Sequence, residues 1–270
     1  MIKTAINKEI PCLYHYQKFK EEYIADVLLR NRIKFANPSS FNDPWDCRIN
    51  FSKQLLDNPE IYKANVEYAI DMQRRYLRLS EPELTSRREQ LMTDRAFMEA
   101  RIDEYTQGMN DAINKDYRVY CFSSEPDNFL MWAHYTGNHK GLCFGFKTAS
   151  NVFSEAMEVT YSELYPQLDP AENDENKFFR DALLTKAEVW CYEKEFRLIA
   201  KESDSESFFT LENGYLSFDP ADLVSVIVGC SASENDIQVL KKILNERKLP
   251  VELFQARPAS DRYSFVIQDL

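Results

Sequence analysis

Two glutamates and an arginine stand at alternate positions in residues 190–200, WCYEKEFRLIA. The stretch is rich in aromatic and branched residues and lacks Gly and Pro, so it predicts a strand. A strand would set Glu193, Glu195 and Arg197 on one face, with the two carboxylates about 6 to 7 Å apart. Such a pair suits chemistry at a sugar carbon, because one carboxylate can stabilise positive charge on the ring while the other positions an attacking group. The same face would equally serve cross-strand ion pairs with no catalytic role.

The composition is that of a folded protein with an acidic surface. At 270 residues, with 44% hydrophobic and 13% aromatic residues, the chain can bury a large core. Its 44 acidic residues against 33 basic ones give a net charge of -11, which argues against non-specific binding to duplex DNA or to an anionic membrane. The N-terminus lacks the apolar core of a secretion signal, and no run reaches membrane-spanning length. We therefore expect a cytoplasmic protein with no membrane partner.

The six cysteines are dispersed, with no Cys-x-x-Cys pair and no short Cys/His cluster. Free thiols in a reducing compartment fit this pattern better than a disulfide framework or a zinc site. No metal site is predicted on this basis.

The order of elements predicts an α+β fold. Strands are expected at 12–16, 117–122, 141–146 and 190–200, and a long, highly charged helical stretch is expected between the first two. We expect one elaborated domain over residues 1–270, with a helical insertion at about 54–115. Between the second and third of these strands, Ser123 and Ser124 form a turn into a short helix that ends near Tyr135.

Four motifs together resemble a widespread, largely bacterial family known as domain of unknown function 2971. They are LYHY at 13–16, FNDPWD at 41–46, LMWAHYTGNHKGLCFGF at 130–146 and WCYEKEFRL at 190–198. The resemblance spans residues 13–198, and the motif set is specific. The family name supplies no activity.

The order of the elements also looks like that of ADP-ribosyltransferases, which grip NAD with a His or Arg on the first strand, a Ser or Tyr at a second site and a Glu at a third. This resemblance implies a mixed or antiparallel sheet core and NAD as the substrate. Residue by residue, it would assign His15 to the nicotinamide-side ribose and Ser123 or Ser124 to the second site. Glu195 would be the catalytic glutamate and Glu193 its companion.

The same resemblance implies that Tyr135 stacks on the nicotinamide. Arg197 is counted among the cofactor-binding residues, where it would either anchor Glu195 or only balance the carboxylates. Glu125 stands where many relatives have a third small polar residue, and the long insertion between the first two sites is atypical. The expected reaction transfers ADP-ribose to a protein or nucleic-acid target, as in a bacterial toxin or a phage-defence effector. The sequence does not indicate an oligomeric state.

Two other classes of function remain open at this point. In a metal-dependent nuclease, Asp43, Asp46, Glu193 and Glu195 would gather around Mg²⁺, with Lys186 or Lys194 nearby. A non-catalytic interaction or sensor module would keep the fold without the chemistry.

Overall fold

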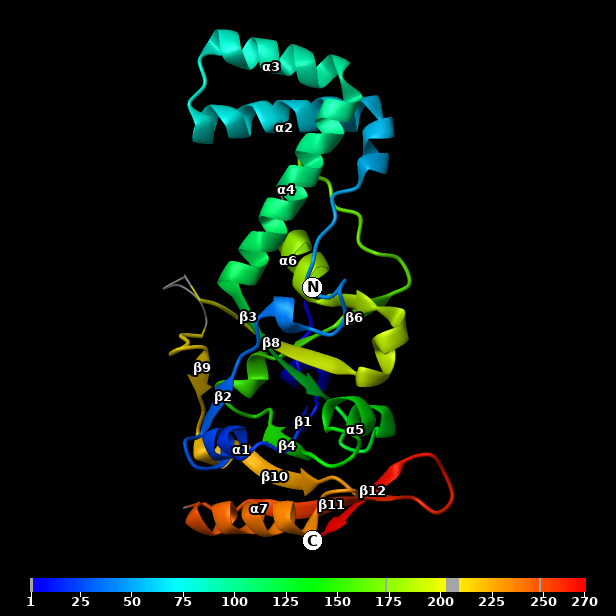
Figure 1. The fold of residues 1–270 in the computed structure, drawn as a ribbon. Helices are drawn as coiled ribbons and strands as arrows, with labels where there is room; N and C mark the ends of the chain where they lie inside the picture. Colours follow the sequence, from blue (N-terminus) through cyan, green and yellow to red (C-terminus); the bar gives the residue numbers. More distant parts are fainter. Residues whose placement is uncertain (1, 173, 203–208, 248) are drawn as a thin grey trace.

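The computed structural model describes residues 2–172, 174–202, 209–247 and 249–270, and its centre is an eight-stranded sheet (Figure 1). The strand order is β12-β11-β10-β4-β1-β3-β8-β5, and β10 and β11 are the parallel pair among antiparallel ones. The strands are β1 (Cys12–Gln17), β3 (Tyr117–Ser123), β4 (Leu142–Lys147), β5 (Met157–Glu158), β8 (Glu195–Lys201), β10 (Leu223–Val228), β11 (Glu252–Pro258) and β12 (Phe265–Asp269). Two small sheets pair β2 (Arg32–Lys34) with β9 (Tyr215–Ser217), and β6 (Thr160–Ser162) with β7 (Thr185–Ala187).

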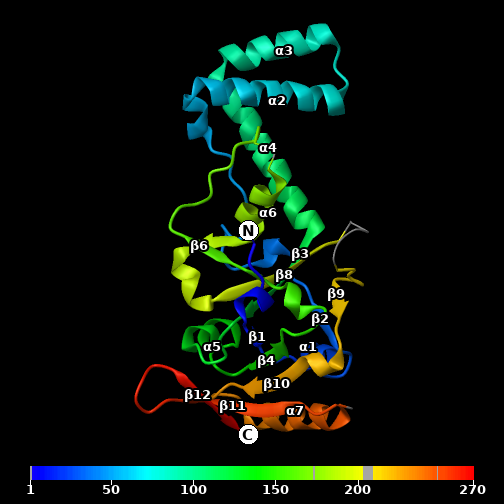
Figure 2. The same cartoon turned by 180° about the vertical axis from the view of Figure 1, so that it is seen from behind.

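Helices lie at both ends of this sheet, and the fold is α+β, as predicted. They are α1 (Glu21–Leu28), α2 (Pro59–Leu77), α3 (Glu81–Thr93), α4 (Arg95–Asp116), α5 (Phe129–Tyr135), α6 (Glu175–Leu183) and α7 (Glu234–Glu246). Helices α2 and α3 project at one end of the molecule, α4 leads from them back to β3, and α7 lies at the opposite end beside the C-terminus (Figures 1 and 2). Within the described ranges, no helix combines the length and the apolar character needed to cross a membrane.

The central sheet opens between β1 and β3. Strand β1 pairs with β4 along its whole length, and β3 pairs with β8 along its whole length. Between β1 and β3, however, the register has a single pair, Tyr14 with Ser123. Next to that pair, the His15 ring donates from Nδ1 to the Cys121 carbonyl oxygen at 2.8 Å. In a continuous sheet this carbonyl would accept from a backbone N–H of the neighbouring strand, and here a side chain replaces that donor. The opening leaves room for a cavity in the middle of the sheet.

Helix α5 is held rigidly against the sheet at this opening. Its Trp132 side chain is fully buried, its indole N–H donates to the Pro126 carbonyl oxygen at 2.8 Å, and its ring meets Tyr16 edge-on with centroids 5.2 Å apart. Asn128 caps the helix by accepting from the Leu130 and Met131 amides. These contacts fix the orientation of the last helical residue, Tyr135.

The strand predicted for 190–200 is wrong over its first five residues. Residues Glu188–Glu193 form a 3-10 helix, η5, Lys194 takes a left-handed conformation with φ 45°, and β8 begins at Glu195. The aromatic residues there have high strand propensity, but tertiary hydrogen bonds override it. The side-chain amide of Asn128 donates to the Tyr192 carbonyl oxygen at 2.7 Å, and the backbone N–H of Ser124 donates to the Lys194 carbonyl oxygen at 3.1 Å. Glu193 therefore reaches the site from a turn, and Glu195 reaches it from a strand.

Candidate functional site

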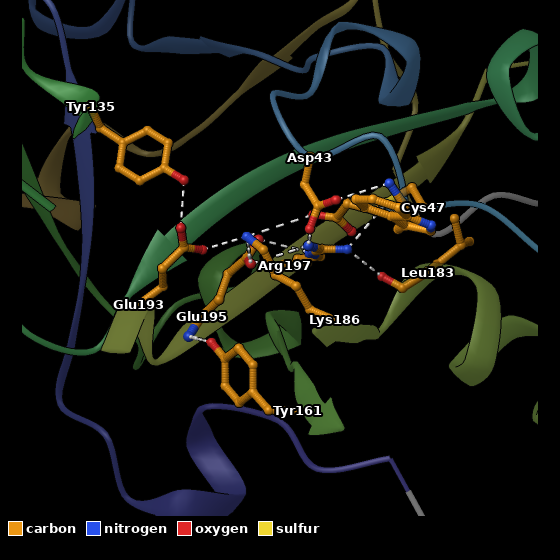
Figure 3. Close-up of polar contacts among 11 residues, drawn as sticks. Asp43, Cys47, Tyr135, Tyr161, Leu183, Lys186, Glu193, Glu195 and Arg197 are labelled. Atoms are coloured by element: carbon orange, nitrogen blue, oxygen red, sulfur yellow. Dashed lines mark hydrogen bonds and ion pairs between the residues drawn. The ribbon is translucent and has the colours of Figure 1, made fainter. Parts of the chain in front are cut away.

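Five charged side chains meet where β8 begins and are almost completely buried. We call them the charge cluster: Asp46, Lys186, Glu193, Glu195 and Arg197. Figure 3 labels four of them, Lys186, Glu193, Glu195 and Arg197. The fully buried Arg197 guanidinium donates to Glu195 at 2.7 and 3.1 Å and to Asp46 at 2.7 Å. It also donates to the Leu183 carbonyl oxygen at 2.8 Å and to Cys47 Sγ at 3.1 Å, so five acceptor atoms fix its plane. Arg197 thus holds Glu195, two residues before it in the chain, and also balances the charge of Asp46.

Lys186, on β7, contacts all three carboxylates of the charge cluster. Its Nζ lies 3.0 Å from Glu195 Oε2 and 3.6 Å from Asp46 Oδ2, and it also donates to Glu193. Tyr135 donates its hydroxyl to the other oxygen of Glu193, a contact visible in Figure 3. The two glutamates, predicted to share a strand face, thus come together through a shared lysine.

The charge cluster has more negative than positive charge. It holds three carboxylates and two cations, which leaves an excess of one negative charge when every group is ionised. Asp46 Oδ1 is buried and has no hydrogen-bond partner in the described part of the chain. Buried charge without compensation is costly, so the cluster favours either a proton on one carboxyl group or a cation bound beside it.

Local electrostatics push the two glutamates in opposite directions. Burial acts to raise the pKa of Glu195, but Arg197 and Lys186 outweigh it and hold that pKa well below its ordinary value. Burial and the charge of Glu195 raise the pKa of Glu193, against the lowering effect of Lys186 and Tyr135. Glu195 therefore stays ionised, and Glu193 is the carboxyl group that exchanges a proton more readily.

The charge cluster borders a cavity of about 210 Å³ that lies in the opening of the sheet. His15, Tyr135, Glu193 and Glu195 all line it, although they come from β1, α5, η5 and β8. Asp46 and Lys186 line it as well. Four of the seven predicted site residues are thus brought to one cavity.

Ser123, Ser124 and Arg197 are not among the residues that line this cavity. Ser123 is fully buried, and its hydroxyl accepts from the Glu125 amide at 3.1 Å. The Ser124 amide holds the Lys194 carbonyl oxygen. Ser124 therefore holds the turn that separates Glu193 from Glu195, whereas Ser123 holds the turn that follows β3.

His15 is arranged to accept a hydrogen bond from a ligand. Its ring stacks on Tyr120 with centroids 4.2 Å apart, and burial lowers its pKa from 6.5 to about 4, so it is neutral at pH 7. The bond to the Cys121 carbonyl oxygen assigns the proton to Nδ1. Nε2 is then the unprotonated acceptor, which suits a hydroxyl group.

Sequence reasoning considered Asp46 and Lys186 only as parts of a metal-dependent alternative. In the structure they compensate Glu195 and Arg197, and no group of three or more His, Cys, Asp or Glu among the described residues is arranged to hold a metal ion. The signal that points to them is physical. Two glutamates in a segment that is to be buried need cations nearby, and Lys186 is the closest lysine that precedes the segment.

The fold and the site together define an α+β protein whose central sheet is split beside a buried charge cluster. Residues 131–198 match the model of the family described as protein of unknown function (DUF2971), and this match supports the family that the motifs at 130–146 and 190–198 predict. The match includes Tyr135, Lys186, Glu193, Glu195 and Arg197. No curated protein and no solved structure matches the chain significantly.

His15 is expected to make the protein less stable in weak acid. Because its pKa falls from 6.5 to about 4 on folding, its contribution to stability is complete above pH 6.5 and is lost as the pH falls towards 4. His15→Asn keeps an N–H donor for the Cys121 carbonyl oxygen but cannot titrate. Urea unfolding at pH 7 and pH 5 should show a smaller loss of stability for His15→Asn than for the wild type. His134→Asn, at an exposed position on α5, is the control and should keep the wild-type loss. If the stability of His15→Asn depends on pH as that of the wild type does, His15 is not the group whose lowered pKa causes the loss of stability.

Proposed function

We propose that the chain is an ADP-ribosyltransferase-like enzyme that transfers ADP-ribose from NAD to a protein or nucleic-acid target and releases nicotinamide. The observation that carries the proposal is that His15, Tyr135 and Glu195, from three separate elements, line one cavity where the sheet opens. In type and in chain order, they correspond to three of the groups that the resemblance to ADP-ribosyltransferases assigns to NAD, while the second-site serines, Ser123 and Ser124, do not line this cavity.

The charge of the cluster supports this chemistry. The nicotinamide ring of NAD is cationic, and breaking its bond to the ribose C1′ sends the bonding electron pair to the ring nitrogen and leaves positive charge on the ribose. A preorganised negative field stabilises such charge most where water is excluded. The excess negative charge at Glu193, Glu195 and Asp46 lies at the wall of a cavity in the protein interior.

The opposite pKa directions give the two glutamates different roles. Glu195, held ionised by Arg197 and Lys186, stabilises the positive ribose. As the target hydroxyl or amino group forms its bond to C1′, it loses a proton, which Glu193 accepts. A raised pKa makes Glu193 the better base of the two.

His15 and Tyr135 would position the substrate. The Nε2 of neutral His15 accepts a hydrogen bond from a ribose hydroxyl, and the bond from its Nδ1 to Cys121 prevents the ring from turning. The Tyr135 ring provides an aromatic surface at the cavity for the nicotinamide, while its hydroxyl orients Glu193.

The direct test is to incubate the purified protein with NAD and to measure nicotinamide release by chromatography, with and without a cell lysate as a source of target. We expect release above the rate of NAD alone, and a rise in melting temperature with NAD, because a ligand that binds the folded state stabilises it. A folded protein that neither releases nicotinamide under either condition nor melts at a higher temperature with NAD would refute the proposal.

Tyr135→Phe is expected to move the pH dependence of the reaction. The Tyr135 hydroxyl lowers the pKa of Glu193, so its removal raises that pKa further. Because Glu193 acts as a base, the rate falls below its pKa, and the acidic limb of the pH–rate profile should shift to higher pH. Tyr62→Phe removes a hydroxyl that donates to the Leu91 carbonyl oxygen between α2 and α3, and its profile should match the wild type. A shift to lower pH in Tyr135→Phe would be incompatible with the role given to Glu193.

A further inference from the structure

A second cavity, of about 590 Å³, adjoins the first. The two cavities share six lining residues, which are His15, Tyr16, Lys34, Ala36, Tyr120 and Tyr135. The second cavity extends from them towards α1 and β2, on the side away from the charge cluster. A ligand that fills the first cavity therefore has a direct route into the second.

Four cationic side chains stand on the wall of this second cavity. Lys18, Lys20, Arg32 and Lys34 line it, and the three lysines form no ion pair with any described residue. The Lys34 Nζ lies 5.4 Å from the Tyr215 ring centre, and the Arg32 guanidinium lies 4.1 Å from the same centre. In a protein with a net charge of -11, such a concentration of positive charge at a cavity is suited to an anionic ligand, for which phosphate groups are the usual match.

One buried carboxylate interrupts the cationic wall. Asp26, on α1, is 3% exposed, and its Oδ1 accepts from Arg30 at 3.0 Å and from Arg32 at 2.8 Å. Its Oδ2 is buried with no partner among the described residues, and the same holds for Nε2 of Gln17, another lining residue. An unsatisfied buried acceptor is costly, and a sugar hydroxyl would satisfy it. A phosphate would not, because it brings further acceptors and negative charge.

We propose that the second cavity holds the adenosine diphosphate half of the dinucleotide, with its diphosphate on the lysines and its ribose hydroxyls on Asp26, so that the site prefers NAD to NADP. This inference rests on the proposed function for its substrate. Arg30 and Arg32 already bind Oδ1 of Asp26, so the discrimination falls on Oδ2: a 2′-hydroxyl donates a hydrogen bond to it, whereas the 2′-phosphate of NADP would place its own acceptor oxygens and negative charge against it. Asp26 is thus a specificity-determining residue that lies outside the charge cluster.

Isothermal titration calorimetry with ADP, NAD and NADP tests the assignment. We expect wild-type protein to bind ADP, to bind it more weakly as salt increases, and to bind NADP at least about tenfold more weakly than NAD. Lys18→Ala combined with Lys34→Ala should weaken ADP binding by about tenfold or more, since two phosphate contacts are lost. Lys8→Ala, whose lysine pairs with Glu158 and does not line the cavity, should bind ADP as the wild type does.

Asp26→Asn tests the discrimination itself, because it keeps an acceptor but removes the charge. The difference in binding affinity between NAD and NADP should be smaller in this variant than in the wild type. If the loss of the pairs with Arg30 and Arg32 prevents folding, the comparison of NAD with NADP in the wild type decides alone. Equal affinities there would overturn the specificity, and failure to bind ADP would overturn the site.

These outcomes are separate from those that bear on catalysis. A protein that binds ADP and discriminates against the 2′-phosphate, yet releases no nicotinamide, would refute the proposed reaction and keep the site. A protein that cleaves NAD but ignores ADP and accepts NADP equally well would keep the reaction and refute this site.

Discussion

Glu195→Gln is expected to reduce nicotinamide release by at least about 100-fold, since removal of one preorganised electrostatic group at the reacting centre typically costs that much. The change removes the charge that stabilises the positive ribose and keeps the shape of the side chain. It also leaves the charge cluster with two carboxylates and two cations, so the cluster becomes neutral and the fold should tolerate the change. Initial rates of nicotinamide release at saturating NAD provide the measurement.

Glu158→Gln is the matched control for this variant. Glu158 lies on β5, which pairs with β8, but its carboxylate faces Lys8 and does not line the cavity. Its rate should stay within about twofold of the wild type, as for a surface substitution away from the site. If Glu195→Gln is folded and as active as the control, Glu195 does not stabilise the reacting ribose.

Arg197→Met is expected to destabilise the protein by about 3–5 kcal/mol, the usual cost of removing one partner from a buried ion pair. Arg197 is fully buried and balances Asp46 and Glu195, so its loss leaves three buried carboxylates with Lys186 as their one cation in the cluster. The Leu183 carbonyl oxygen loses its donor as well. The midpoint of urea unfolding, with the slope checked for constancy, measures the change.

At acidic pH, the difference in the free energy of unfolding between Arg197→Met and the wild type should become smaller. Burial acts to raise the pKa of Glu195, but Arg197 and Lys186 lower it by more, so this pKa falls on folding. The ionised Glu195 therefore stabilises the fold above its unfolded pKa of 4.5, and this stabilisation is lost as the pH falls below 4.5. The wild type should therefore lose stability more steeply than the variant below pH 4.5. Arg75→Met removes an exposed pair with Asp71 on α2 and should cost less than about 1 kcal/mol. A loss of that small size in Arg197→Met would show that the charge cluster is not a significant source of stability.

The sequence was sufficient for the class of fold and for the chemistry of the candidate groups. Periodicity and turn residues predict the strands around residues 14, 120 and 144 and the helical stretch before β3, because these depend on local propensity and on burial of one face. The paired glutamates are recognisable from their alternate spacing, whereas His15 and Tyr135 are singled out by the resemblance to ADP-ribosyltransferases.

Contacts between residues far apart in the chain decided the rest. The turn at Lys194 depends on hydrogen bonds from Ser124 and Asn128, about 70 residues earlier in the chain, which no local pattern contains. Asp46 accepts a hydrogen bond from Arg197, which lies 151 positions later in the chain. That Asp26 Oδ2 is buried without a partner beside the second cavity follows only from the packing of α1 in the fold. Residue types and spacing therefore specify which groups are available and which segments form strands or helices. Which carboxylate is neutralised, which one titrates and which faces a cavity depend on burial and on distant partners, because electrostatic free energies are set by three-dimensional distance and solvent exclusion.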